Sequence, residues 1–95
     1  MRLSIEAIKK ELLEKGFTYN ESNKLWYYEY SDFEILSFII DEHTKVNGDK
    51  CIAISDLNIS DYINGVMIFN LNYTLYFDNF NNFYELLTLL NYKIY

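Results

Sequence analysis

Residues 25–40 have the sequence LWYYEYSDFEILSFII, and this stretch decides the fold. Strand-forming residues fill 25–30, and a tight Ser31-Asp32 turn leads into a second predicted strand over 33–40. Because side chains alternate along a strand, both faces of the second strand are largely apolar, and we expect it to lie inside a sheet. One face of the first strand carries three aromatic side chains, those of Trp26, Tyr28 and Tyr30.

The N-terminal residues predict a helix over 5–15. Its apolar side chains recur at helical spacing, and Ser4 precedes them as an N-cap. Gly16 is placed to end the helix in a left-handed conformation, with Phe17 packing back on Leu12. The helix therefore stops at a defined point and directs the chain into the sheet.

Turn-forming residues divide the next part of the chain into strands. Residues 17–19 form a hairpin with 25–30, across a turn rich in Asn and Ser. Asp41–Asp49 is a long polar stretch with a strong Asn47-Gly48 turn signal, and it predicts a loop or a hairpin tip. A further strand is expected over Lys50–Ser55.

The C-terminal half is less clear until its last helix. Residues 56–65 fit either one capped helical turn or an irregular connection, and 66–77 fit one long strand or two strands joined by a tight Asn-Leu-Asn turn. Apolar side chains at helical spacing predict a helix over 81–91, with Asp78 or Asn79 as its N-cap. The tail, 92–95, is expected to add an edge strand or to pack on the domain.

These elements predict one α+β domain over residues 1–95. We expect an antiparallel sheet of four to six strands, with the N-terminal and the C-terminal helix packed on one face. The 95 residues are 51% hydrophobic and 19% aromatic, which excludes a disordered chain because such a sequence buries enough apolar surface to fold.

The sequence carries no signature of an enzyme or of a cofactor site. With one cysteine and one histidine, a nucleophile–base pair would have to be Cys51–His43, and a buried Cys51 with a solvated loop His43 is the simpler interpretation. The acidic groups around Gly48 lack the spacing of a calcium-binding loop. We therefore expect no catalytic residue, no metal and no cofactor. The lone thiol and the absence of a secretory leader or an apolar span favour the cytoplasm.

Charge is the informative feature. The chain has 8 Lys and Arg against 14 Asp and Glu, a net charge of −6, which disfavours binding to nucleic acid and favours a basic partner. Residues 21–49 contain seven acidic residues and two lysines. Carboxylates spaced along strands and turns imitate the phosphate spacing of a nucleic acid. The same charge also fits a domain that is merely soluble. The predicted partner-binding residues are Glu21, Glu29, Asp32, Glu34, Asp41, Glu42 and Asp49.

Composition suggests the source of such a protein. The chain has 10 Tyr, many Ile and Asn, and no Pro, a bias typical of AT-rich bacterial or phage genomes. A small acidic protein of this kind is expected to act as an inhibitor encoded by a phage or mobile element. It would occupy the basic nucleic-acid groove of a bacterial defence protein, as anti-CRISPR or anti-restriction proteins do by nucleic-acid mimicry. Reversing Asp32 and Glu34 to Lys should then abolish binding.

Two alternatives remain open from the sequence. The first is an immunity or antitoxin-like protein that blocks a toxin nuclease, whose active site is also cationic. The second is a homo-oligomeric structural module, a homodimer for example, in which exposed aromatic side chains make the contact.

Overall fold

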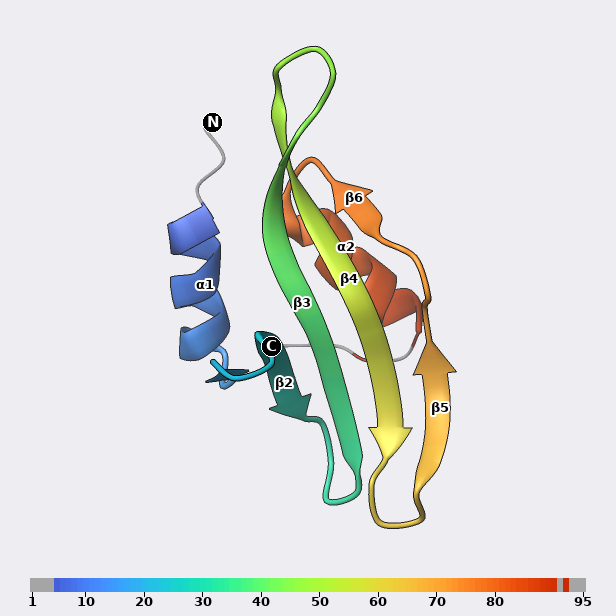
Figure 1. Cartoon of the computed structure of the whole chain (residues 1–95). Helices are drawn as coiled ribbons and strands as arrows, with labels where there is room; N and C mark the ends of the chain where they lie inside the picture. Colours follow the sequence, from blue (N-terminus) through green and yellow to red (C-terminus); the bar gives the residue numbers. More distant parts are fainter. Residues whose placement is uncertain (1–4, 91, 93–95) are drawn as a thin grey trace.

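The computed structural model describes residues 5–90 and 92, and it contains an antiparallel sheet with a helix at each end of the chain (Figure 1). The fold is therefore α+β, as predicted. The elements are α1 (Ile5–Glu14), β1 (Thr18–Asn20), β2 (Leu25–Glu29), β3 (Glu34–Thr44), β4 (Lys50–Asp61), β5 (Val66–Asn70), β6 (Leu75–Phe77) and α2 (Phe80–Leu89).

The sheet is built around the long β3–β4 hairpin. Its strand order is β1-β2-β3-β4-β5, with β6 paired to β4 beside β5, and every pairing is antiparallel. The prediction that residues 33–40 lie inside the sheet is confirmed, because β3 lies between β2 and β4. Leu36, Phe38 and Ile40 on one face of β3 are buried, whereas Ile35 and Ile39 on the other face are half-buried.

One hydrophobic core joins the sheet to both helices. The ring of Phe38 lies 5.6 Å from that of Phe17 and 4.9 Å from that of Phe83, so this side chain links the start of β1 to α2. Figure 1 shows α2 passing behind β4. Cys51 is fully buried, as predicted. The buried side chains of the core are those of Ile8, Leu12, Phe17, Trp26, Leu36, Phe38, Ile40, Ile52, Ile54, Leu57, Ile59, Phe80, Phe83 and Leu87.

The helix ends follow the sequence signals. Gly16 has φ +96°, the N–H of Phe17 donates to the carbonyl of Leu12 at 2.9 Å, and that of Gly16 donates to Leu13 at 3.1 Å. This is the predicted left-handed helix stop, which leaves the last carbonyls of α1 satisfied. At α2 the side chain of Asn79 accepts from the N–H of Asn82, which identifies Asn79 as the N-cap.

Of the loop or hairpin tip predicted over Asp41–Asp49, the hairpin tip is confirmed, but the first half of the stretch is strand. β3 continues to Thr44, and the turn is confined to Lys45–Asp49, where the N–H of Lys45 donates to the carbonyl of Asp49 at 2.7 Å. Cross-strand pairing with β4 extends the hairpin although its side chains are polar and exposed. Tertiary pairing outweighs the weak strand preference of Asp and Glu here.

The strand predicted over Lys50–Ser55 is longer and runs to Asp61, because a bulge carries it past the predicted end. Asp56 adopts φ +53°, and the register with β3 shifts between Ser37 and Ile39. One extra residue reverses the alternation, so even-numbered side chains before the bulge and odd-numbered ones after it face the core. The alternation of apolar and polar residues breaks at Asp56, so the sequence did not predict the second half of β4.

Residues 66–77 form two strands, but no tight turn joins them. β5 pairs with Asn58–Asp61 of β4 and β6 pairs with Ile52–Ile54, so the two lie end to end along the same edge of β4. The N–H of Leu71 still donates to the carbonyl of Leu57. The backbone pairing between β5 and β4 therefore extends to Leu71 before the chain turns toward β6. In the tail, the ring of Tyr92 packs on that of Tyr30, at 4.8 Å, and residues 93–95 lie outside the described part.

Candidate interaction surface

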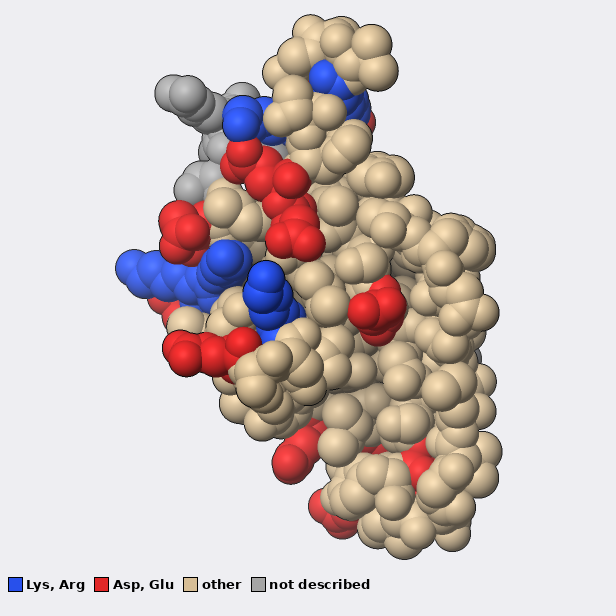
Figure 2. Space-filling view, viewed as in Figure 1, with Lys and Arg blue, Asp and Glu red and all other residues tan. Residues whose placement is uncertain are grey.

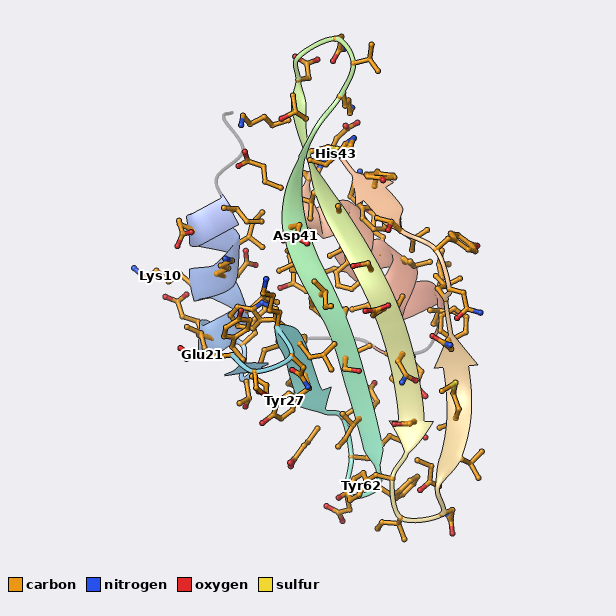
Figure 3. The ribbon with its side chains drawn as sticks, in the orientation of Figure 1. Lys10, Glu21, Tyr27, Asp41, His43 and Tyr62 are labelled. Carbon is orange, nitrogen blue, oxygen red and sulfur yellow. The ribbon has the colours of Figure 1, made fainter. Side chains whose placement is uncertain are left out.

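The structure distributes the seven predicted carboxylates over three places. Glu29, Asp32 and Glu34 lie around the β2–β3 turn at one end of the sheet. A second group lies on the outer half of the β3–β4 hairpin, at the opposite end of β3. The rise per residue of an extended strand places this group about 25–30 Å from the first. Glu21 lies apart from both, in the β1–β2 turn (Figure 3). The members of the second group are Asp41, Glu42 and Asp49.

The carboxylates of the β3–β4 hairpin have cationic neighbours. The Nζ of Lys50 lies 2.5 Å from Oε1 of Glu42, and the Nζ of Lys45 lies 2.5 Å from Oδ1 of Asp78. Asp78 raises the pKa of the Lys45 ammonium through this hydrogen bond and its charge. The negative field at this end of the molecule is therefore partly neutralised.

Among residues 5–90 and 92, the opposite end of the sheet has no such neighbours. Glu34 and Asp61 are direct cross-strand partners in the β3–β4 pairing, with Glu29 and Asp32 close along the chain. The sequence contains no Lys or Arg from residue 25 to 44 or from 51 to 92, and no ion pair forms there among the described residues. In Figure 2 the described Lys side chains lie at the top and along the left side, and only Asp and Glu colour the lower end. We call Glu29, Asp32, Glu34 and Asp61 the acidic end.

Asp61 belongs to this surface although it is not among the seven residues predicted from the sequence. Its Oδ1 accepts from the N–H of Ile63 at 3.1 Å and of Asn64 at 3.0 Å, and its Oδ2 accepts from Nδ2 of Asn64 at 2.8 Å. These hydrogen bonds, those from Asn64 first, lower the pKa of Asp61 and favour its charged form. The signal in the sequence was the Asp-Tyr-Ile-Asn-Gly run, which is typical of an Asx turn.

Two exposed aromatic side chains lie at the acidic end. The hydroxyl of Tyr62 donates to the backbone carbonyl of Asp32, and the N–H of Tyr62 donates to that of Phe33 at 3.1 Å. These bonds join the β4–β5 turn to the β2–β3 turn, and Figure 3 shows Tyr62 at the lower end of both strands. Tyr62 is 51% exposed and Phe33 is 45% exposed, so their rings are available to a partner.

The base of the acidic end is fixed to the domain through Tyr92. Burial, with the hydrogen bond to the Glu34 carboxylate, raises the pKa of Tyr92 to about 12. Glu34 is half-buried, unlike Asp32 and Glu29, which are exposed. Glu34 is therefore held by the fold, and the two exposed carboxylates are the better probes of binding.

His43 and Cys51 are cross-strand partners in the β3–β4 hairpin, so the placement of His43 in a loop is corrected. The His43 ring is exposed and packs on that of Tyr76, with the ring centroids 4.7 Å apart. Cys51 is inaccessible to solvent, which is typical of a structural thiol. Over residues 5–90 and 92, no group of three or more His, Cys, Asp and Glu side chains is arranged to hold a metal ion.

The surface also has a shallow hollow beside β1 and β2. Its volume is about 350 Å³, and it is open to solvent. Glu29 at its edge belongs to the acidic end, and the other lining residues are Gly16, Thr18, Tyr27 and Tyr28.

Comparisons with protein-family models, with curated proteins and with solved structures find no match to this chain. Within the described residues, no helix is long and apolar enough to cross a membrane.

Proposed function

We propose that this protein is a small acidic inhibitor that inserts the acidic end into a cationic, nucleic-acid-binding groove of a larger bacterial protein. One observation carries the proposal: four carboxylates and two exposed aromatic rings share one end of the sheet where no described Lys or Arg is present. The proposal keeps three of the seven predicted residues, Glu29, Asp32 and Glu34, at its centre.

The physics of this surface favours a cationic partner. Unpaired carboxylates attract a cationic groove over the Debye length of about 8–10 Å and speed the encounter. Once docked, Tyr62 and Phe33 supply the apolar anchors that give an interface most of its affinity. A nucleic acid would be repelled by the same field, so the partner is a protein that itself binds nucleic acid.

The way the helices support the sheet fits this role. We infer that α1 and α2 share one face of the sheet, because Ile8 and Phe83 belong to one core and the Nζ of Lys15 lies 5.2 Å from the Tyr84 ring. Both hairpin turns of the acidic end then project from a sheet that is supported from one side. A rigid support lowers the entropy that binding has to overcome.

A phage or mobile-element gene acting in the host cytoplasm is the setting that composition and charge favour. An immunity protein that blocks a toxin nuclease would use the same surface on the same kind of groove. The adjacent gene separates the two: a toxin gene favours immunity, and phage structural genes favour an inhibitor of defence.

The test uses the tagged protein to capture partners from bacterial lysate, with the variant Glu29→Lys/Asp32→Lys and the control Asp41→Lys/Asp49→Lys. Both double reversals change the net charge equally, from −6 to about −2, and all four side chains are exposed. We expect the wild type and the control to capture a nucleic-acid-processing protein that added nucleic acid displaces. The first variant should capture none. Equal capture by both variants, or an empty wild-type bait, would contradict the proposal.

A further inference from the structure

β5 is an edge strand that lacks the usual protection against pairing. It lies at the end of the strand order, and β4 is its neighbour in the described structure. Its sequence, Val-Met-Ile-Phe-Asn, has no charge and no proline, and Met67 is 58% and Ile68 47% exposed. Natural edge strands carry Lys, Pro or a cover because their free N–H and C=O groups pair with other chains. Among the described residues, a bulge at Ile68, opposite Ile59 and Ser60, is the one such protection that β5 has.

The charge pattern indicates which partner this edge accepts. Tyr62–Phe77 contains no ionisable acid or base of the Asp, Glu, Lys, Arg or His type, although the chain as a whole has a net charge of −6. Two copies of such a chain repel each other through their net charge, and this repulsion is weakest along an uncharged strip. A basic partner, by contrast, gains nothing electrostatically from this strip.

We propose that β5 pairs with β5 of a second copy of this chain, in antiparallel orientation about a twofold axis. The two sheets then join into one continuous sheet in which Ile68 meets Ile68 of the second copy at the axis, and Met67 lies opposite Phe69. A twofold contact of this kind uses one surface patch on both subunits and closes after two copies. Main-chain hydrogen bonds supply affinity, as in β-augmentation.

Antiparallel pairing also keeps the acidic ends apart. The acidic end lies beside Val66, where β5 begins, and pairing brings that position against Asn70 of the second copy, where β5 ends. The two acidic ends therefore point in opposite directions and stay free. The dimer does not rest on the proposed inhibitor function, and neither excludes the other.

The interface is small, since β5 has five residues and spans about 17 Å. Interfaces below about 1,200 Å² belong to the weak, transient class, so we expect dimerisation in the micromolar range. Added salt should leave this dimer unchanged or strengthen it, because salt screens the repulsion between two acidic copies.

Sedimentation of the full chain from 5 to 500 µM tests the proposal, a range set about the expected micromolar constant. We expect the mass to rise from 11.4 kDa toward twice that value.

Ile68→Lys should weaken dimerisation about tenfold or more, since two like charges then meet at the axis. Val46→Lys makes the same charge change at a fully exposed apolar residue of the β3–β4 turn and should leave the dimer intact. If Ile68→Lys does not fold, Ile68→Thr replaces it, because Thr retains strand preference and removes apolar area.

Amide hydrogen exchange provides the second readout. The amides of β5 should become more protected as concentration rises in the wild type and in Val46→Lys, and should not in the Ile68 variant. A chain that stays monomeric at the highest concentration would overturn the proposal. So would a dimer that Ile68→Lys leaves unchanged, or protection of β5 only after a strand-forming peptide is added.

Discussion

At the scale of single residues, two aspartates fix the local geometry of β4 and of the turn that follows it. Asp56 adopts φ +53°, which L-residues other than Asn and Asp rarely do, and it provides the bulge that returns Leu57 and Ile59 to the core. Asp61 closes the β4–β5 turn by accepting three hydrogen bonds. Both act through local geometry, since neither is deeply buried.

Replacing Asp56 tests the bulge. Asp56→Gly should be neutral or stabilise the domain by up to about 1 kcal/mol, because Gly adopts a positive φ without strain. Asp56→Val should destabilise it by about 1–2 kcal/mol, since a β-branched residue is disfavoured there. Urea unfolding of both variants measures the difference. A Val variant as stable as the Gly variant would show that the left-handed conformation is not required.

Asp61 should make stability depend on pH. Its carboxyl has a pKa below 3.8 in the folded state, so the stabilisation is present at neutral pH and is lost as pH falls below about 3.8. Asp61→Ala should therefore lower Tm at pH 7 and flatten the decline of Tm in acid. Asn64→Ala, which removes one of the three donors, should produce a smaller change of the same sign. Parallel Tm curves for Asp61→Ala and the wild type would contradict this assignment.

At the scale of elements, α2 shows how one helix face secures the core. Phe83 is fully buried, with ring contacts to Phe38, Phe77 and Phe80, whereas Leu89 on the same helix is 81% exposed. Removal of a buried ring leaves a cavity that the surrounding side chains fill only in part. The two positions therefore offer a matched comparison within one element.

Phe83→Ala should lower the free energy of unfolding by about 3–5 kcal/mol, and Leu89→Ala by less than about 0.5 kcal/mol. Chemical denaturation followed by Trp26 fluorescence measures both, because Trp26 is buried in the same core. Similar losses in the two variants would mean that α2 does not pack as described.

The sequence predicts elements well where one local signal decides them. The helix stop at Gly16 and the central position of 33–40 follow from spacing or from a special residue. The sequence does not predict elements whose formation depends on pairing between distant residues. The polar residues 41–44 join a strand only because β4 pairs with them, and the bulge at Asp56 breaks the alternation on which the prediction depended. Asp61 was missed as a site residue for the same reason.

At the scale of the whole molecule, the placement of charge matters more than its sum. The domain is elongated, 44 × 29 × 27 Å. Among the described residues, Glu42 of the β3–β4 hairpin forms an ion pair with Lys50, whereas no carboxylate of the acidic end forms one. The seven predicted carboxylates do not form one continuous stripe, because Glu21 and the hairpin group lie apart from the others. Any mimicry of a nucleic acid is therefore expected to be local, at the acidic end.

The most direct test of the central claim is the salt dependence of affinity for the captured partner, measured by titration at several NaCl concentrations. The wild type and Asp41→Lys/Asp49→Lys should lose affinity steeply as salt rises. Glu29→Lys/Asp32→Lys should bind about tenfold or more weakly at low salt, with a much flatter dependence. Equal affinity and equal salt dependence for both double variants would contradict binding through the acidic end.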